Sequence, residues 1–274
     1  MDQDGPTWTK EKVMDQKPLI IGHRGASAHA PENTLAAFQM AIDAGVDGVE
    51  FDVQLAKDGV PVVIHDATLK RTGGQKDAVA DLTSKELAKI DVGSWFNKKY
   101  PKRANADFAK ETIPTLAQAL RLSKRSNGLI YIELKATDND YRDLAKRVCD
   151  VIRDSTMLPR IIVKSFKLSA IPEIRHYLPE VQTAALFAPQ ILDYLRRRKY
   201  IIALAREFGA HQISLHHSLV TKNLTALATQ AAMPVTIWTA DNPKWVKRCQ
   251  KLGIRALITN DPERLISVRD VKNK

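Results

Sequence analysis

Short apolar, β-branched segments recur along the chain, and most of them are followed by a stretch with the periodicity of an amphipathic helix. Two such stretches are PENTLAAFQMAIDAG, which begins at Pro31, and TKNLTALATQAA, which begins at Thr221. The pattern predicts eight strands, at residues 19–22, 48–53, 60–64, 129–134, 161–164, 183–186, 212–215 and 235–238. Nearly continuous apolar strands that alternate with helices are typical of a parallel sheet covered on both faces.

Eight such units in a chain of 274 residues fit a (β/α)8 TIM barrel. The alternative is a doubly wound open sheet. A dinucleotide-binding sheet of that kind carries a G-x-G-x-x-G turn after its first strand, whereas this chain has GHRGAS from Gly22. We therefore predict an α/β fold of the TIM-barrel type.

Residues 67–112 depart from this rhythm. The interval follows the third predicted strand and contains a capping-box pattern from Thr83 to Glu86, then the segment DVGSWFNKKYPKR. Long excursions in compact domains are usually functional lids or small subdomains. We predict an inserted subdomain over the barrel mouth, within one barrel domain of residues 18–274.

The first 17 residues mix charged and polar side chains without an apolar core segment, which predicts a flexible tail and not a signal peptide. No run of about 18 apolar residues occurs, which argues against a transmembrane segment. Cys149 and Cys249 lack the close paired spacing of a zinc site. We expect reduced thiols and hence a cytoplasmic location.

The formal net charge is +11, from 42 Lys and Arg against 31 Asp and Glu. Such a charge favours an anionic partner: a phosphate ester, an anionic membrane surface or a nucleic acid. The densest basic cluster, Arg196 to Lys199, is interpreted as the solvated face of an amphipathic helix. Aromatic residues are only 6% of the chain and no recognition module is visible, so we predict no nucleic-acid partner.

Unusual polar residues gather where predicted strands end, and in a barrel these ends converge on the active-site face. By strand, they are His23 and Arg24 after the first, Glu50 and Asp52 on the second, His65 and Asp66 after the third, Glu133 and Lys135 on the fourth, Lys164, Ser165 and Phe166 at the end of the fifth, and Trp238 on the eighth.

Glu50 and Asp52 are two residues apart in a strand, so both carboxylates point to the same face, into the barrel. Glu133 and Lys135 repeat this spacing on the fourth strand. Acidic groups crowded inside a barrel repel one another and lose hydration, and a divalent cation relieves both effects. An all-oxygen ligand set favours Mg²⁺ or Ca²⁺ over zinc. The alternative is a set of internal salt bridges to Arg24 and Lys135.

His23 and His65 flank the carboxylates and are the candidates for acid–base catalysis, because imidazole titrates near neutrality. Arg24 and Lys135 are candidates to hold phosphate oxygens; their alternative role is to balance the carboxylates. The remaining histidines are interpreted as surface or packing residues, with His217 kept in view because it follows the seventh strand.

The chain contains, in this order, the segments GHRGASAHAPENTLAAF, GVEFDVQLAKDGVPVVIHDATLKRTGG, IPTLAQAL, YIELK, SF, IWTADNP and LITNDPE. Taken together, these segments resemble the glycerophosphodiester phosphodiesterase family, and the likeness runs from Leu19 to Glu263. The resemblance implies a (β/α)8 barrel with a small insertion after the third strand. It also implies metal-dependent hydrolysis of small-molecule glycerophosphodiesters to glycerol 3-phosphate and an alcohol such as choline or ethanolamine.

The resemblance assigns roles to individual positions. It implies metal ligands at Glu50, Asp52 and Glu133, a catalytic pair at His23 and His65, phosphate-binding residues at Arg24 and Lys135, and an aromatic residue at Trp238 that packs against the glycerol or alcohol part. Glu32 and Asn33 match the PENT turn and are expected to tie the first helix to the site. The chain departs from the family by lacking a Gly near His29 and by having Lys167 after SF, which bears on leaving-group preference.

The expected mechanism has two displacements. One histidine deprotonates the free glycerol hydroxyl beside the phosphate, and the resulting cyclic glycerophosphate is then opened by water; we favour His23 as the first base. Direct attack by water held at the metal is the alternative. Phospholipase D-type hydrolysis of lysophospholipid or sphingomyelin headgroups would use much the same residues, with transient contact to a membrane surface. A non-catalytic phosphate-ligand-binding protein is the alternative from a different class. The sequence leaves the oligomeric state open.

Overall fold

The structure is a computed structural model that describes residues 17–191 and 199–271. All but the last residue of the tail predicted at residues 1–17 lies outside this range, as do Arg196 to Arg198 of the basic cluster. Among the described residues, none of the helices is both long enough and apolar enough to span a bilayer.

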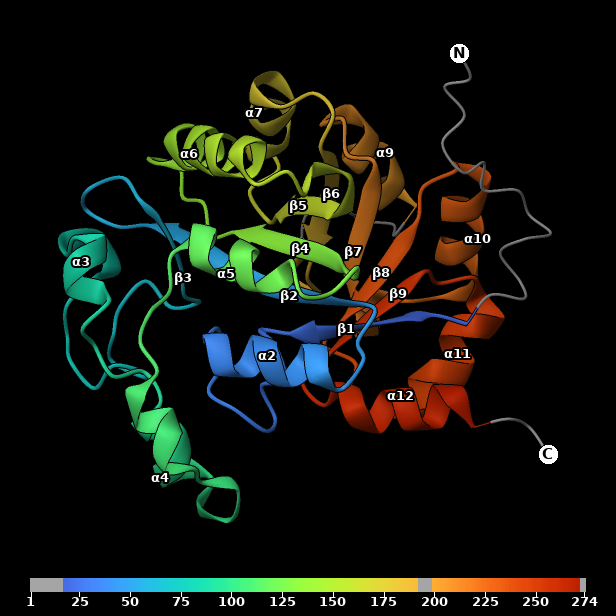
Figure 1. Ribbon diagram of the computed structural model, residues 1–274. Coiled ribbons are helices and arrows are strands. Elements are labelled where there is room, and N and C mark those ends of the chain that lie inside the picture. Colours follow the sequence, from blue (N-terminus) through green and yellow to red (C-terminus); the bar gives the residue numbers. More distant parts are fainter. Residues whose placement is uncertain (1–16, 192–198, 272–274) are drawn as a thin grey trace.

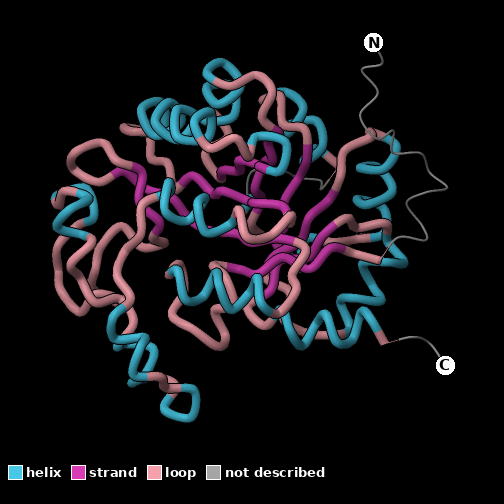
Figure 2. The backbone as a smooth tube through the Cα atoms, viewed as in Figure 1, coloured by secondary structure: helices cyan, strands magenta, loops and turns pink. Residues whose placement is uncertain are grey.

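Eight parallel strands form a closed barrel with helices around the outside (Figure 1; Figure 2). The strands are β1 (Leu19–His23), β2 (Gly48–Leu55), β4 (Leu129–Leu134), β5 (Ile161–Ser165), β6 (Gln182–Phe187), β7 (Gln212–His216), β8 (Val235–Trp238) and β9 (Ala256–Thr259). Each pairs in parallel with the next, and β1 closes the barrel by pairing with both β2 and β9. The predicted TIM barrel is confirmed.

A helix separates each barrel strand from the next. The helices are α2 (Leu35–Asp43), α5 (Leu116–Ser123), α6 (Tyr141–Asp154), α7 (Ala170–Tyr177), α9 (Tyr200–Glu207), α10 (Lys222–Gln230), α11 (Lys244–Leu252) and α12 (Pro262–Asp270). Their apolar faces pack on the outward-facing side chains of the strands, and this layer holds most of the buried core. Helix α2 starts sharply because the Thr34 hydroxyl accepts a hydrogen bond from the backbone N–H of Ala37.

Two of the predicted strand assignments need correction. The third predicted strand, β3 (Pro61–Val63), is not a barrel strand: it pairs antiparallel with β2. The turn between them is only a few residues long and includes Gly59 with φ +73°, whereas a parallel return needs a long crossover connection. The eighth barrel strand is β9, whose four residues ALIT are all buried. So short an apolar run gives little periodicity from which to predict a strand.

The long interval between β3 and α5 contains short helices. They are η1 (Val79–Asp81), α3 (Ser84–Leu87), α4 (Ser94–Lys99), η2 (Pro101–Arg103) and η3 (Ala106–Lys110), and α3 and α4 extend away from the barrel wall in Figure 1. The predicted capping box at Thr83 and Glu86 is present at the start of α3. Phe96 and Phe108 pack with Ala30 and Ala37, which connects the interval to the β1–α2 loop and to α2.

The interior of the barrel changes character along its axis. Toward the N-terminal ends of the strands it is filled by an apolar cluster that includes Tyr131 and Ile162. Two residues further along the same strands, the inward-facing side chains are Glu133 and Lys164, and both are buried. The chain therefore places its buried charges at the C-terminal end of the barrel, where active sites of this fold are built.

Candidate active site

Three carboxylates meet inside the barrel mouth, as the sequence predicts. Glu50 and Asp52 come from β2 and Glu133 from β4, and Asp52 and Glu133 are direct neighbours in the strand register. Their exposed fractions are 0%, 1% and 6%. One oxygen from each lies within 4.8 Å of the others, which is close enough for a single ion to bind all three.

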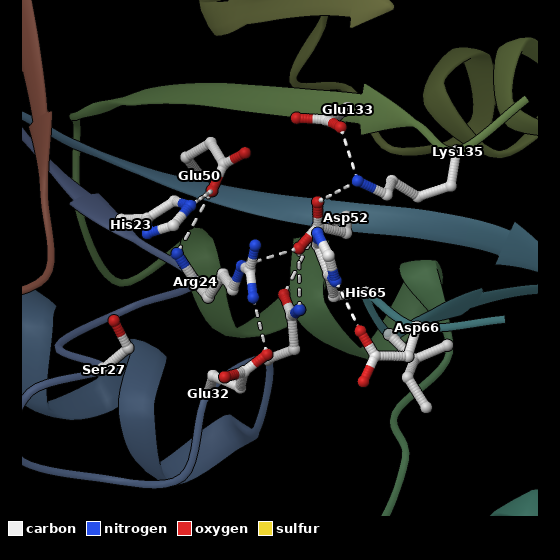
Figure 3. A network of polar contacts seen from close by, with 12 residues as sticks. His23, Arg24, Ser27, Glu32, Glu50, Asp52, His65, Asp66, Glu133 and Lys135 are labelled. Carbon is white, nitrogen blue, oxygen red and sulfur yellow. Dashed lines mark hydrogen bonds and ion pairs between the residues drawn. The ribbon is translucent and has the colours of Figure 1, made fainter. Parts of the chain in front are cut away.

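Arg24 and Lys135 lie against this cluster (Figure 3). Arg24 Nε is 3.0 Å from Asp52 Oδ2, and Lys135 Nζ is 2.8 Å from Glu133 Oε1 and 3.5 Å from Asp52 Oδ1. Burial raises the pKa of Asp52, but Arg24 and Lys135 outweigh it and hold that pKa well below its ordinary value. Asp52 is therefore an anion at neutral pH.

Lys164 on β5 is a third cation in the site; sequence reasoning noted it at a strand end but assigned it no role. Its Nζ lies 2.9 Å from Glu50 Oε1 and 3.6 Å from Glu133 Oε2, and its side chain is 2% exposed. Burial lowers the pKa of Lys164, but Glu50 and Glu133 raise it above the ordinary value. The signal was present in the sequence: a lysine in an otherwise apolar strand, IIVKS, at an inward-facing position.

These contacts mean that the internal salt bridges considered from the sequence do form. Glu50 Oε1 has a cation beside it, since Lys164 Nζ lies 2.9 Å away. Three carboxylates that each offer an oxygen within 4.8 Å of the others suit a hard divalent cation. Glu50, Asp52 and Glu133 thus fit such an ion.

His23 is held through its Nδ1 atom, which lies 2.6 Å from Asn260 Oδ1. The Asn260 amide nitrogen donates to Asp241 Oδ2 at 2.8 Å, and Ser27 donates to Asn260 Oδ1 at 2.9 Å. Since a carboxylate accepts hydrogen bonds only, the amide nitrogen must face Asp241 and the amide oxygen must face His23. His23 therefore carries its proton on Nδ1. Its Nε2, 4.0 Å from Glu50 Oε2, is left with a free lone pair.

His65 has a different partner. Its Nδ1 lies 2.7 Å from the carboxylate of Asp66, which also accepts a hydrogen bond from Arg71 Nε at 2.6 Å. The Nδ1 atom of His65 thus faces a carboxylate, whereas that of His23 faces an amide oxygen. The two predicted catalytic histidines therefore have different partners.

Two residues of the PENT turn, Glu32 and Asn33, form hydrogen bonds with residues of the site. Asn33 donates from its side chain to Asp52 Oδ2 at 2.9 Å, and Glu32 accepts from Arg24 Nη1 at 2.7 Å. Arg24 and Asn33 both have positive φ, 53° and 59°, a conformation that costs energy for residues other than glycine and that is often kept at functional sites. The backbone N–H of Arg24 donates to Glu50 Oε2 at 3.1 Å.

Trp238 lies on the other side of the mouth, among aromatic rings. Phe166 contacts it edge-on at 5.4 Å between ring centroids, and His216 contacts it at 5.2 Å. Phe166 is 43% exposed. Burial, and then the neighbouring His217, lower the pKa of His216, so this ring is neutral at pH 7. The rings form an apolar wall on the β5–β8 half of the mouth.

A separate cavity of about 240 Å³ lies at the opposite, N-terminal end of the barrel. It is lined mainly by apolar residues, among them Leu19, Met233 and Ile254. No predicted catalytic or metal-ligating residue lines it. The residues capable of phosphodiester chemistry all lie at the other end.

Comparisons with known proteins agree with this geometry. A sequence model of the glycerophosphoryl diester phosphodiesterase family matches residues 23–264. A glycerophosphodiester phosphodiesterase of Caldanaerobacter subterraneus is 32% identical over 252 residues, which cover 92% of this chain and 98% of that protein. One from Bacillus altitudinis is 30% identical over 252 residues, with the same coverage of 92% and 98%.

Among solved structures, the fold is shared with an Oleispira antarctica phosphodiesterase in complex with the product sn-glycerol-3-phosphate. The TM-score is 0.80 at 24% sequence identity, and the match covers 94% of this chain and 99% of the other.

Proposed function

This chain belongs to the glycerophosphoryl diester phosphodiesterase family and is an enzyme of that class, and from this premise we propose its substrates and mechanism. It hydrolyses glycerophosphodiesters such as glycerophosphocholine and glycerophosphoethanolamine to glycerol 3-phosphate and an alcohol. The observation that carries the proposal is the buried cluster of Glu50, Asp52 and Glu133 beside two histidines with different partners.

Glu50, Asp52 and Glu133 would hold one divalent cation, Mg²⁺ or Ca²⁺. When bound, this cation stabilises negative charge on the non-bridging phosphate oxygens. Arg24 and Lys135 supply the remaining positive charge, Arg24 through its planar guanidinium and Lys135 as a point charge. Lys164 pairs with Glu50 and Glu133 and helps to hold both carboxylates in place.

The hydrogen bonds of the two histidines support a division of labour. His23 Nε2 takes the proton from the glycerol hydroxyl next to the phosphate, and the hydroxyl oxygen attacks phosphorus. The bond from phosphorus to the alcohol oxygen breaks, and His65, which is oriented by its contact with Asp66, donates a proton to that oxygen. Water then opens the cyclic glycerophosphate, with the histidines in reversed roles.

A coupled assay of glycerol 3-phosphate release tests the proposal across several headgroups, with and without added metal. His23→Ala and His65→Ala should each lose roughly 10²–10⁴ in turnover. His176→Ala, which changes an exposed histidine on α7, is the matched control and should retain full activity. Folded His23→Ala and His65→Ala variants with near-normal turnover would show that the acid–base assignment is wrong.

Hydrolysis of lysophospholipid headgroups is the second candidate, because Phe166 exposes an aromatic face next to Trp238 where an acyl chain can lie. Parallel assays with glycerophosphocholine and lysophosphatidylcholine separate the two activities; we expect the soluble diester to be preferred.

A cytoplasmic location is supported by Cys149 and Cys249, which are both free and buried thiols.

A further inference from the structure

Arg71 lies next to the site and binds two carboxylates, Glu32 and Asp66, that are not part of the Glu50, Asp52 and Glu133 cluster. Its Nη1 and Nη2 donate to the two oxygens of Glu32 at 2.8 and 2.7 Å, and its Nε donates to Asp66 Oδ2 at 2.6 Å. A guanidinium is the one side chain with enough donors in a rigid plane to hold two carboxylates in this way. Burial of Arg71 is only partial, since 40% of its side chain is exposed.

Each of these two carboxylates leads to a different functional group (Figure 3). Glu32 accepts a hydrogen bond from Arg24, which in turn contacts Asp52. Asp66 lies against Nδ1 of His65. Arg71 is therefore linked to the proposed phosphate-binding residue Arg24 through Glu32. It is linked to the proposed proton donor His65 through Asp66.

A later part of the interval between β3 and α5, to which Arg71 itself belongs, also reaches the site at this point. The Arg71 guanidinium lies 5.6 Å from the centre of the Trp95 ring, at the start of α4. The Trp95 indole N–H donates to the backbone carbonyl of Val92 at 2.8 Å, which fixes the ring. Next along the chain, Phe96 is fully buried against the β1–α2 side of the barrel. The indole thus limits the positions that the Arg71 fork can occupy.

We propose that Arg71 is a positioning residue: through Glu32 and Asp66 it fixes the positions of Arg24 and His65 relative to each other. Trp95 in turn holds the Arg71 guanidinium in place. The inference rests on the proposed function, since it gives a role to groups of the same site. Arg71 itself touches neither substrate nor metal in this scheme. Its loss frees two carboxylates at once, and a displacement of about 1 Å at reacting groups can cost 10²-fold in rate.

The test compares Arg71→Met and Arg71→Lys with the wild-type enzyme, using glycerophosphocholine as substrate and glycerol 3-phosphate as a binding probe in calorimetry. Arg71→Met should lower kcat about 10- to 100-fold, raise KM several-fold and weaken binding of glycerol 3-phosphate. Arg71→Lys should recover little, because an ammonium lacks the planar fork. The control is Arg153→Met, which removes an exposed arginine that pairs with Asp150 at 2.9 Å on the outer helix α6 and should change none of these quantities.

A double-mutant cycle separates positioning from general destabilisation. If Arg71 acts through Asp66, Arg71→Met combined with Asp66→Asn should lose no more kcat than the worse single variant. If it acts through Glu32, Arg71→Met combined with Glu32→Gln should raise KM no further than one change alone.

Additive losses in both cycles, or kcat and KM of Arg71→Met within threefold of wild type, would overturn the proposal. If Arg71→Met does not fold, Arg71→Lys takes its place in both cycles. A wild-type enzyme without diesterase activity would refute the proposed function instead. The binding of glycerol 3-phosphate to wild type and Arg71→Lys would then still report whether Arg71 positions Arg24.

Discussion

At the scale of single residues, Lys164 shows how much a buried charge depends on its partners. It is 2% exposed and compensates Glu50 and Glu133. Lys164→Met should lower the free energy of unfolding by about 3–5 kcal/mol, since it leaves the buried Glu50 carboxylate without its lysine partner. Denaturant titration measures this. Lys146→Met is the control: Lys146 is exposed, pairs with Asp150 at 3.1 Å one helical turn away, and should change stability by less than about 1 kcal/mol.

Divalent cation should partly restore the Lys164→Met variant, because an ion bound by the carboxylates replaces the missing positive charge. An equal loss of stability in Lys164→Met and Lys146→Met would contradict the buried ion pairs.

Glu32 makes stability depend on acid pH. Burial raises the pKa of Glu32, but the hydrogen bond from Arg71 and the charge of Arg24 lower it below the ordinary value. A carboxyl group with a depressed pKa in the folded state contributes stability above its unfolded-state pKa, about 4.3, and this contribution is lost as pH falls through the folded-state pKa. Thermal unfolding at pH 3 to 7 should therefore show a smaller acid-side loss for Glu32→Gln than for wild type. Identical acid slopes would rule out this contribution.

The residue scale is also where sequence reasoning succeeded most. Period-two spacing placed Glu50 and Asp52 on one face of a strand, and the structure places both inside the barrel. The same spacing marks Lys164 as inward-facing, yet a single lysine within an apolar run has no partner visible in the sequence. Its partners Glu50 and Glu133 come from two other strands, so only the closed barrel reveals them.

At the scale of elements, α4 depends on one aromatic anchor. Phe96 is fully buried between Phe108 and the alanines of the β1–α2 region. Phe96→Ala should lower the free energy of unfolding by about 3–5 kcal/mol through the lost apolar contact and the cavity left behind. Limited proteolysis should also become faster within residues 94–110. Leu227→Ala is the control: Leu227 is a 38% exposed leucine on α10, and this variant should behave as wild type. Unchanged proteolysis of Phe96→Ala would show that α4 is held by other contacts.

Element assignment from sequence was correct for seven of the barrel strands but not for the eighth, and the reasons are local. β3 has the same apolar, β-branched character as a barrel strand, PVV, but its direction is set by the tight turn at Gly59 and not by its composition. β9 is only four residues long, so its identity comes from pairing with β1 and β8 on either side. Local sequence determines strand propensity, whereas partner and direction depend on connections and tertiary contacts.

At the scale of the whole molecule, the proposed metal ion would couple the site to folding. Mg²⁺ or Ca²⁺ that binds only the folded chain stabilises it by RT ln(1 + [ion]/Kd), about 2.7 kcal/mol at 100 times Kd, which raises Tm by several degrees in a domain of this size. Thermal unfolding with each ion should show this shift in wild type and not in Glu50→Gln. Chelator should abolish activity, and added ion should restore it. Activity indifferent to chelator, or an equal Tm shift in Glu50→Gln, would remove the metal site.

The sequence by itself determined the alternation of apolar strands and amphipathic helices, the strand ends that carry the polar residues, and the set of candidate carboxylates, histidines and cations. These follow from local chemistry and spacing, which need no knowledge of the fold. Only the tertiary structure decided which strand closes the barrel, that Lys164 neutralises Glu50, and that Asn260 and Asp66 give His23 and His65 different partners. The Lys164–Glu50 and His23–Asn260 contacts join residues from separate strands and loops, and only barrel closure brings them this close. His65 and Asp66 are adjacent in the sequence, and their contact depends on the conformation of the loop after β3.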